Sequence, residues 1–168
     1  GLMTRCWISV GSNIDREASI RGALQALQQG FGDLIPSPVY ETEAVGFEGA
    51  PFYNLVVGIE TSASVGEINA ALRAIEDRLG RIRGHERFAS RTLDLDLLTY
   101  GMEVGLIDGC QLPRDEILEY AFVLRPLADV APEERHPVDG RDYQTLWQTM
   151  APHAPIMRSV ALENPLDA

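Results

Sequence analysis

Residues 52–80 read FYNLVVGIETSASVGEINAALRAIEDRLG and contain two patterns in succession. From Phe52 to Glu60 the side chains alternate between two sets, as in a β-strand. The expected core face is Tyr53, Leu55, Val57 and Ile59, and the opposite face is Phe52, Asn54 and Val56. Ser64 and Glu67 then have the spacing of a capping box. Apolar residues follow three and four positions apart up to Gly80: Val65, Ile68, Leu72, Ile75 and Leu79. The stretch predicts a strand followed by an amphipathic helix.

A second strand and helix are predicted upstream. Side chains alternate over residues 6–10, which predicts a strand that ends at Gly11-Ser12-Asn13. This tripeptide is interpreted as a turn leading into a helix rather than as a phosphate-binding loop. Asp15 is a candidate N-cap for that helix. Residues 36–42 then predict a short strand.

The chain between and after these elements is more irregular. Residues 43–51 contain two glycines and a proline without periodicity, which predicts a mobile loop. Residues 93–100 predict a strand, and a Gly-rich, hairpin-like segment follows through Gly109. Helices are predicted around residues 122–129 and 143–150. We expect residues 3–150 to form a single domain and residues 151–168 to be a poorly ordered tail.

The order of the predicted elements indicates the fold class. Strand, helix, strand, strand, helix, strand is the order of a ferredoxin-like α+β sandwich. In this fold the helices pack on one face of an antiparallel sheet, and the segments after the last of these strands are extra C-terminal elements. The other face of the sheet is then expected to be free for a ligand.

The composition excludes several classes of protein. The chain has 168 residues, 45% of them hydrophobic, and no apolar run approaches the roughly 20 residues that span a bilayer. The net charge of −11 opposes binding to nucleic acid, because such binding relies on many cations. Cys6 and Cys110 lack metal-site spacing and predict two reduced thiols. We expect a cytoplasmic monomer without a membrane or nucleic-acid partner.

The basic residues are unevenly distributed. All fourteen are arginines, and five lie within fourteen consecutive positions: Arg78, Arg81, Arg83, Arg87 and Arg91. The planar guanidinium group binds phosphate oxygens in pairs, so this cluster suits a compact anion such as a nucleoside triphosphate. A solvated loop, in which the arginines pair with Glu76, Asp77 and Glu86, remains an equal alternative.

Residues 93–98, directly after this cluster, read LDLDLL. In a strand Leu93, Leu95 and Leu97 share one face. Asp94 and Asp96 share the other face. Two carboxylates about 6.7 Å apart repel by roughly 2.5 kcal/mol at an effective dielectric of 20, so exposure to water or a cation must relieve them. Mg²⁺ suits two carboxylates together with substrate phosphates, and Arg91 would neutralise those phosphates. A wet acidic strand face is the alternative.

The run from Arg87 to Leu98, RFASRTLDLDLL, resembles the signature of the 6-hydroxymethyl-7,8-dihydropterin pyrophosphokinase family. The similarity covers about residues 5–135 and extends to other segments: Val10 to Asn13, Tyr40 to Thr42, Asn54, Ile75 to Arg83 and Ala121 to Leu127. The resemblance implies a ferredoxin-like sandwich with extra elements. It also implies transfer of pyrophosphate from Mg-ATP to the hydroxymethyl group of the pterin, giving AMP and the pterin diphosphate of folate biosynthesis.

Position by position, the resemblance implies three sets of residues. Asp94 and Asp96 would bind two Mg²⁺ ions and, with Arg81 and Arg91, form the catalytic set. The ATP-binding positions are Glu76, Arg81, Arg83, Phe88, Arg91, Leu97 and Arg114. The pterin-binding positions are Thr42, Val45, Phe52, Asn54 and Phe122, with the two phenylalanines stacked on either side of the ring. For Phe122, a core position is the alternative.

The sequence departs from the family pattern near the expected phosphates. Arg114-Asp115 replaces a histidine-tyrosine pair, Tyr120 an arginine, Phe88 a tryptophan, and Gly84, beside His85, a basic residue. Arg114 and protonated His85 would supply part of the lost charge. These departures motivate a second hypothesis, a paralogue that binds pterin or nucleotide with little transfer. A third, an RNA-binding ferredoxin-like module, is opposed by the net charge and by the missing aromatic RNA-binding pattern.

Overall fold

The computed structural model describes residues 2–43, 51–82 and 93–162. Four of the predicted site residues lie outside these ranges: Val45, Arg83, Phe88 and Arg91. For Arg81 the backbone alone is described. The predicted loop at residues 43–51 and most of the arginine cluster at residues 78–91 also fall outside the described residues.

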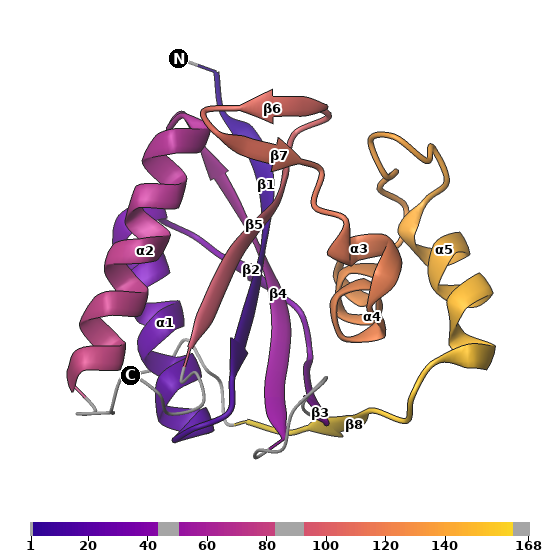
Figure 1. Cartoon of the computed structure of the whole chain (residues 1–168), viewed down its shortest axis with the longest axis horizontal. Helices are drawn as coiled ribbons and strands as arrows, with labels where there is room; N and C mark the ends of the chain where they lie inside the picture. The colour runs from indigo at the N-terminus through magenta and orange to yellow at the C-terminus, as the bar shows by residue number, and fades with distance from the viewer. Residues whose placement is uncertain (1, 44–50, 83–92, 163–168) are drawn as a thin grey trace.

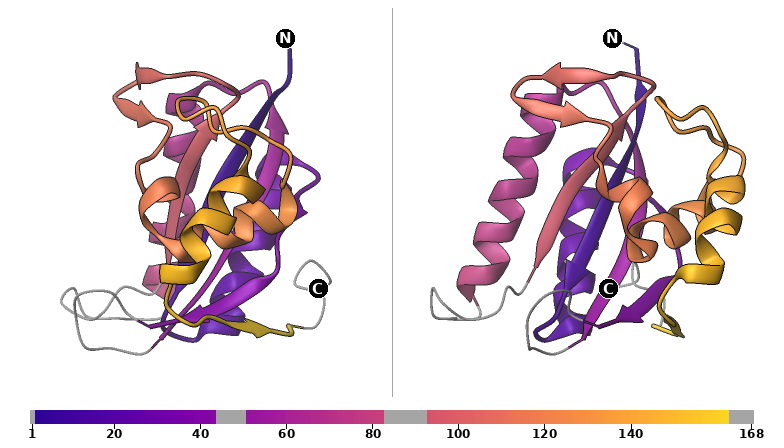
Figure 2. Two further views of the ribbon diagram at one scale, coloured as in Figure 1. Left: turned by 90° about the vertical axis from the view of Figure 1, so that its right-hand side faces the viewer. Right: turned by 45° about the vertical axis from the view of Figure 1, so that its right-hand side comes forward.

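A six-stranded antiparallel sheet forms the centre of the molecule, in the order β5-β1-β4-β3-β8 with β2 paired to β4 (Figure 1). The strands are β1 Thr4–Ser12, β2 Ile35–Pro36, β3 Val39–Thr42, β4 Phe52–Thr61, β5 Asp94–Tyr100 and β8 Arg158–Val160. Two further strands, β6 Gly105–Ile107 and β7 Cys110–Leu112, form the predicted hairpin. Figure 2 shows this hairpin beyond the end of the sheet at which β1 begins. The central four strands have the order of the predicted ferredoxin-like sandwich.

Two long helices, α1 Arg16–Phe31 and α2 Val65–Ile82, cover one face of the sheet (Figure 1). Their apolar sides pack on the alternating residues of β1 and β4, and Leu55, Val57 and Ile59 are all buried there as predicted. Burying each such aliphatic side chain contributes about 1.5 to 3 kcal/mol. The capping box also forms, because the backbone N–H of Glu67 donates to Ser64 Oγ and that of Ser64 to Glu67 Oε1.

The opposite face of the sheet is not free along its whole length, and that part of the prediction is wrong. The helix α4 Ala121–Val130 packs against it, and α3 Glu116–Glu119 and α5 Tyr143–Met150 pack on α4, with α5 on the outside (Figure 1). Trp7, Val56 and Leu98 of the sheet are buried with Val123 and Leu127 of α4 in a second core. This second layer confines the space for a ligand to one end of the sheet.

The C-terminal segment also differs from the prediction of a poorly ordered tail. Residues 151–153 form a 3₁₀ turn, and β8 pairs with β3, with Val160 opposite Val39. Met157 is buried with Tyr40 and Ala121, and Arg158 forms an ion pair with Glu41 at 2.6 Å. Residues 163–168 lie outside the described residues.

None of the helices in the described ranges combines the length and the apolar character needed to cross a membrane.

Candidate functional site

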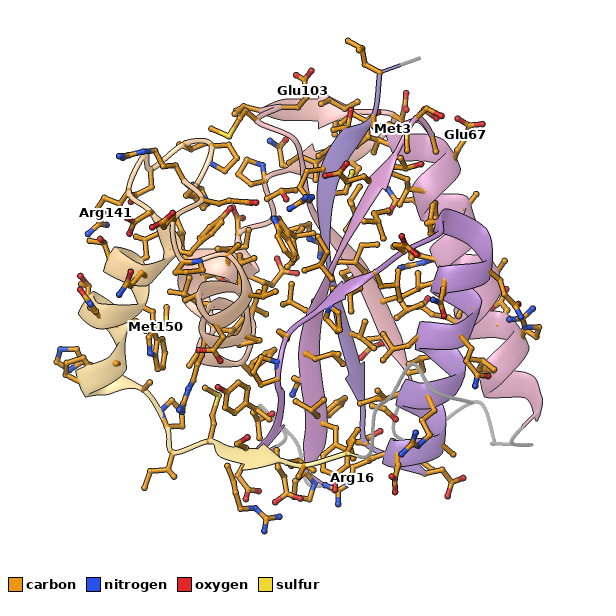
Figure 3. All side chains as sticks on the ribbon, turned by 180° about the vertical axis from the view of Figure 1, so that it is seen from behind. Met3, Arg16, Glu67, Glu103, Arg141 and Met150 are labelled. Atoms are coloured by element: carbon orange, nitrogen blue, oxygen red, sulfur yellow. The ribbon has the colours of Figure 1, made fainter. Side chains whose placement is uncertain are left out.

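A cleft opens at the end of the sheet where β1 and β3 finish and β4 and β5 begin. It is lined by residues from five elements and one loop: Ser9, Val10, Gly11, Thr42, Glu43, Phe52, Asn54, Leu55, Asp94, Asp96, Phe122 and Val123. Arg16 lies at this end of the molecule and Met3 at the opposite end (Figure 3). Six of the predicted site residues therefore border one space, although they are spread over 81 positions of the sequence.

Strand register explains why these side chains meet. Gly11 of β1 pairs with Asn54 of β4 on one side and with Asp94 of β5 on the other. Directly paired residues point to the same face of a sheet. Asn54 and Asp94 therefore lie on the same face, one on each side of Gly11, which has no side chain to separate them. One row further along, Thr42 pairs with Phe52.

Gly11 is a residue whose role the sequence interpretation missed. The sequence predicts a turn at this position, but the structure places Gly11 inside β1. A Cβ atom at this position would lie 2.8 Å from Asn54 Oδ1 and 3.6 Å from the Phe52 ring. The lack of a side chain therefore keeps the cleft open and lets the Asn54 amide lie over the strand. A glycine inside an alternating strand pattern is the signal that indicates such a close approach.

The two phenylalanines border the cleft from different elements, Phe52 from β4 and Phe122 from the start of α4. Phe122 is half-buried, and its ring stacks on that of Tyr120 with centroids 4.9 Å apart. It also packs against both core clusters on this side of the sheet. Phe122 therefore borders the cleft and also packs against the core, and its stacking on a pterin stays a prediction.

The α4 helix is held against β3 by polar contacts as well as by packing. The buried Tyr40 hydroxyl donates a hydrogen bond to Asp129, and the Arg125 guanidinium lies 4.6 Å over the Tyr40 ring. Burial, followed by the bond to Asp129, raises the pKa of Tyr40 to about 12. The Tyr40 hydroxyl is therefore a donor throughout the neutral range. This contact fixes α4, and with it Phe122, relative to the strand that carries Thr42.

The acidic end of the cleft is built around β5. Asp94 and Asp96 face the cleft while Leu95 is fully buried beneath them, as the alternation predicted. The backbone N–H of Leu95 donates to Glu76 Oε2 over 2.7 Å. Burial raises the pKa of Glu76 above its usual value. Glu76 was predicted to contact nucleotide; in the described structure its carboxylate supports the peptide between the two aspartates.

A second hollow adjoins the cleft and shares Asp96 with it. Its lining comes from α2, β5 and the β6–β7 hairpin region: Asn69, Arg73, Asp96, Leu97, Gly109, Cys110, Gln111 and Arg114. Arg114 pairs with Glu116 at 2.6 Å, and this hydrogen bond raises the pKa of the guanidinium. The Leu97 side chain is buried in the core on the helix side of the sheet.

The described residues suit a divalent cation whose coordination is completed by a substrate. Among the described residues, no three His, Cys, Asp or Glu side chains gather as a metal cluster. Asp94 and Asp96 offer two hard oxygen ligand groups to the cleft, and Asp96 also borders the hollow. Mg²⁺ is commonly held by one or two carboxylates while water and substrate phosphates complete its coordination. The donor set fits an ion that arrives with a phosphate ligand.

Comparison with known proteins gives a consistent result. Residues 7–132 match the model of the family described as 7,8-dihydro-6-hydroxymethylpterin-pyrophosphokinase (HPPK). A Bacillus subtilis protein named 2-amino-4-hydroxy-6-hydroxymethyldihydropteridine pyrophosphokinase is 38% identical over 128 residues, which cover 74% of this chain and 76% of the relative. The Pseudomonas aeruginosa protein of the same name is 35% identical over 147 residues, covering 83% and 88%.

Some similar proteins are much longer than this chain. The Pneumocystis carinii folic acid synthesis protein fol1 is 31% identical over 150 residues, which cover 88% of this chain and 20% of that protein. The crystal structure of Plasmodium falciparum HPPK-DHPS superposes with a TM-score of 0.68 at 14% identity, covering 92% of this chain and 46% of that one. An HPPK-DHPS structure in complex with substrates gives a TM-score of 0.73 at 13% identity, covering 91% and 44%. At these identities the structural likeness shows a shared fold.

Proposed function

The chain belongs to the 7,8-dihydro-6-hydroxymethylpterin-pyrophosphokinase family, and from this premise we propose that it transfers pyrophosphate from ATP to the hydroxymethyl group of 6-hydroxymethyl-7,8-dihydropterin. The products are AMP and the pterin diphosphate, an intermediate of folate biosynthesis. The observation that carries the proposal is the register at Gly11, which sets Asn54 and Asp94 on either side of it. The Asn54 amide, which can bond a heterocycle, and the Asp94 carboxylate, which suits a cation, then face the same cleft.

The pterin is proposed to occupy the part of the cleft between Phe52 and Phe122. Flat heterocycles stack favourably on aromatic rings, and both phenylalanines border this space. Asn54 and the backbone near Thr42 would bond the polar edge of the ring, together with Val45, which lies outside the described residues. Asn54 Nδ2 donates to Thr42 Oγ1 over 2.6 Å, so Asn54 Oδ1 is held as an acceptor for a ring N–H.

The triphosphate is proposed to cross from the hollow to the cleft past Asp96. Asp94 and Asp96 would hold two Mg²⁺ ions, which neutralise phosphate oxygens and lower the pKa of the attacking hydroxyl when bound. Arg114 borders the hollow and would contact phosphate or ribose, and Leu97 would contribute its backbone. Glu76 would support this site through Leu95. Arg81, Arg83, Phe88 and Arg91 complete the proposed ATP-binding set.

The chemistry is a displacement at phosphorus. The hydroxymethyl oxygen of the pterin attacks the β-phosphorus, the bond between that phosphorus and the α,β-bridging oxygen breaks, and AMP leaves with the bonding electrons. The hydroxyl proton is lost to solvent. The chain's own residues contribute by positioning the two substrates and by stabilising charge, which are the main sources of catalysis in phosphoryl transfer.

The test is an assay of AMP release that contains ATP, Mg²⁺ and the reduced pterin. We expect AMP and pterin diphosphate in equal amounts, dependent on both substrates. ATP hydrolysis without pterin diphosphate, or no turnover at any Mg²⁺ concentration, would contradict the proposal. Calorimetric binding of both substrates without turnover would instead identify a binding protein.

We further propose that residues 3–150 belong to one domain, which the paired strand β8 extends to Val160, and that the protein is a cytoplasmic monomer. The two cores share the strands β1, β4 and β5, so neither forms without the sheet. Sedimentation equilibrium tests the monomer, because a dimer would give about twice the mass of 18.5 kDa.

A further inference from the structure

Arg73 of α2 contacts three groups of the acidic strand and its support. Its Nη2 donates to the carbonyl oxygen of Leu95, its Nε lies 3.1 Å from Glu76 Oε1, and its Nη2 lies 3.8 Å from Asp96 Oδ1. Because β5 is an edge strand of the described sheet, the peptide groups on its outer side have no strand partner among the described residues. Glu76 and Arg73 therefore satisfy the N–H and the C=O of Leu95, the residue between the two aspartates.

Arg73 also borders the hollow in which the nucleotide is proposed to bind. Arg73 and Arg114 both line the hollow. The Asp96 carboxylate, which lines it too, interacts electrostatically with both guanidinium groups. The Arg73 side chain is 53% exposed, and an ion pair at 3.8 Å with that exposure is weak. Loss of the contact with Asp96 therefore costs little, while the bond to the Leu95 carbonyl and the ion pair with Glu76 keep the guanidinium group beside the hollow.

We propose that Arg73 is an exchangeable counter-ion of Asp96. In the protein without nucleotide its positive charge partly offsets that of Asp96 and opposes the binding of a divalent cation there. When the metal arrives with a triphosphate, Arg73 exchanges its partner and pairs with a phosphate oxygen or the ribose. The inference rests on the proposed function, since it takes Asp96 as a metal ligand and the hollow as the nucleotide site. Its consequence is that metal and nucleotide enter together rather than metal first.

Two binding measurements with opposite expected signs test this exchange. The first titrates Mn²⁺ alone into the nucleotide-free protein and follows free Mn²⁺ by electron paramagnetic resonance. The second measures the affinity for a non-hydrolysable ATP analogue with Mg²⁺ by calorimetry. Arg73→Gln should tighten Mn²⁺ binding at least threefold, because a nearby positive charge is lost. The same variant should weaken binding of the Mg²⁺–ATP analogue at least threefold.

Two further variants separate charge from geometry. Arg73→Lys keeps the charge but not the planar fork, so its Mn²⁺ affinity should stay near that of the wild type. Arg141→Gln removes the same charge from a similarly exposed arginine that pairs with Asp139, ahead of α5 and away from the cleft (Figure 3). Arg141→Gln should change neither affinity.

Several outcomes would overturn the inference. Unchanged Mn²⁺ affinity in Arg73→Gln, or equal tightening in Arg141→Gln, would mean that Arg73 does not compete locally with the metal. Weaker binding of both Mn²⁺ and the ATP analogue would mean that Arg73 serves to hold β5 in place, and urea unfolding would then show a loss of stability. If the wild type binds Mn²⁺ at Asp96 but releases no AMP, the proposed function fails while the competition remains measurable.

Discussion

The side-chain amide of Asn54 donates a hydrogen bond to the Thr42 hydroxyl oxygen over 2.6 Å, across the β3–β4 pair. Both residues are buried. The bond directs the amide nitrogen toward Thr42, so the carbonyl oxygen of the same amide faces Gly11. The orientation of the proposed pterin-reading group therefore depends on the strand neighbour on each side.

Gly11→Ala should lower pterin affinity by about tenfold, or about 1.4 kcal/mol, because the new methyl group would displace the Asn54 amide. Calorimetric titration of the pterin measures the change. Gly30→Ala is the matched control, since a Cβ there meets nothing within 4 Å, and in that helix it should stabilise by about 0.5 to 1 kcal/mol. Equal pterin affinity in both variants would contradict the assigned role of Gly11.

Asp94→Ala and Asp96→Ala should each abolish pyrophosphoryl transfer and leave the fold intact. The carboxylates lie on the cleft side of β5, so their loss removes a mutual repulsion and opens no cavity in the core. We expect the free energy of unfolding to change by less than about 1 kcal/mol. A variant that unfolds yet keeps full turnover per folded molecule would show that the carboxylate is structural.

Phe122→Ala should act on binding and on stability together. Loss of stacking should weaken pterin binding by about 1 to 2 kcal/mol, and loss of the contacts with Tyr120 and the core should lower the free energy of unfolding by a similar amount. ATP affinity should hardly change. Stability loss with unchanged pterin affinity would restrict Phe122 to the core.

His136 should make the stability depend on pH near neutrality. Its Nδ1 accepts hydrogen bonds from the backbone N–H groups of Val138 and Asp139, and burial lowers its pKa below the usual 6.5. The folded state therefore favours the neutral ring, so this contribution is complete above about pH 6.5 and is lost as the pH falls toward the lowered value.

His136→Asn keeps a side-chain acceptor for the same turn but cannot be protonated. We expect a lower overall stability, because the buried ring is lost, but a flatter dependence of stability on pH between 7 and 5.5. Urea unfolding at several pH values measures both. Parallel curves for the wild type and the variant would assign the pH dependence to other groups.

The thiols of Cys6 and Cys110 should differ in reactivity, and bound nucleotide should lower the reactivity of Cys110. Cys6 is fully buried, and burial raises its pKa to about 12, so it should not react with a thiol reagent at pH 8. Cys110 is partly exposed and borders the hollow. Its labelling should slow severalfold when Mg-ATP is bound, and Cys110→Ser should remove the reaction. Labelling of Cys110 that is indifferent to nucleotide would contradict the proposed place of ATP.

Regular alternation allowed much of this fold to be predicted. The two faces of β4, the capping box of α2 and the separation of Leu95 from its acidic neighbours all follow from side-chain periodicity within single elements. The cleft could be predicted in part for the same reason, since Phe52 and Asn54 share a face. Their meeting with Asp94 depends on strand register, which local patterns do not contain.

The missed features depend on partners distant in sequence. Trp7 and Val56 are apolar on the face that was expected to carry a ligand, and α4 covers them. β8 is three residues long and gains its stability from β3, so no periodic pattern marks it. The helical periodicity predicts that Arg73 lies on the exposed side of α2. Its contacts with Leu95 and Asp96 depend on how α2 packs beside β5, which the sequence pattern does not contain.

The two borders of the sheet have a consequence for how the protein behaves at high concentration. Unpaired edge strands are templates for intermolecular pairing and aggregation. On one border, Arg73 and Glu76 engage the peptide groups of Leu95, which a foreign strand would need. On the other, β8 covers β3 and ends the sheet with a short strand that carries the exposed Arg158. The residues that hold the acidic strand in place thereby also protect the chain from edge-to-edge self-association.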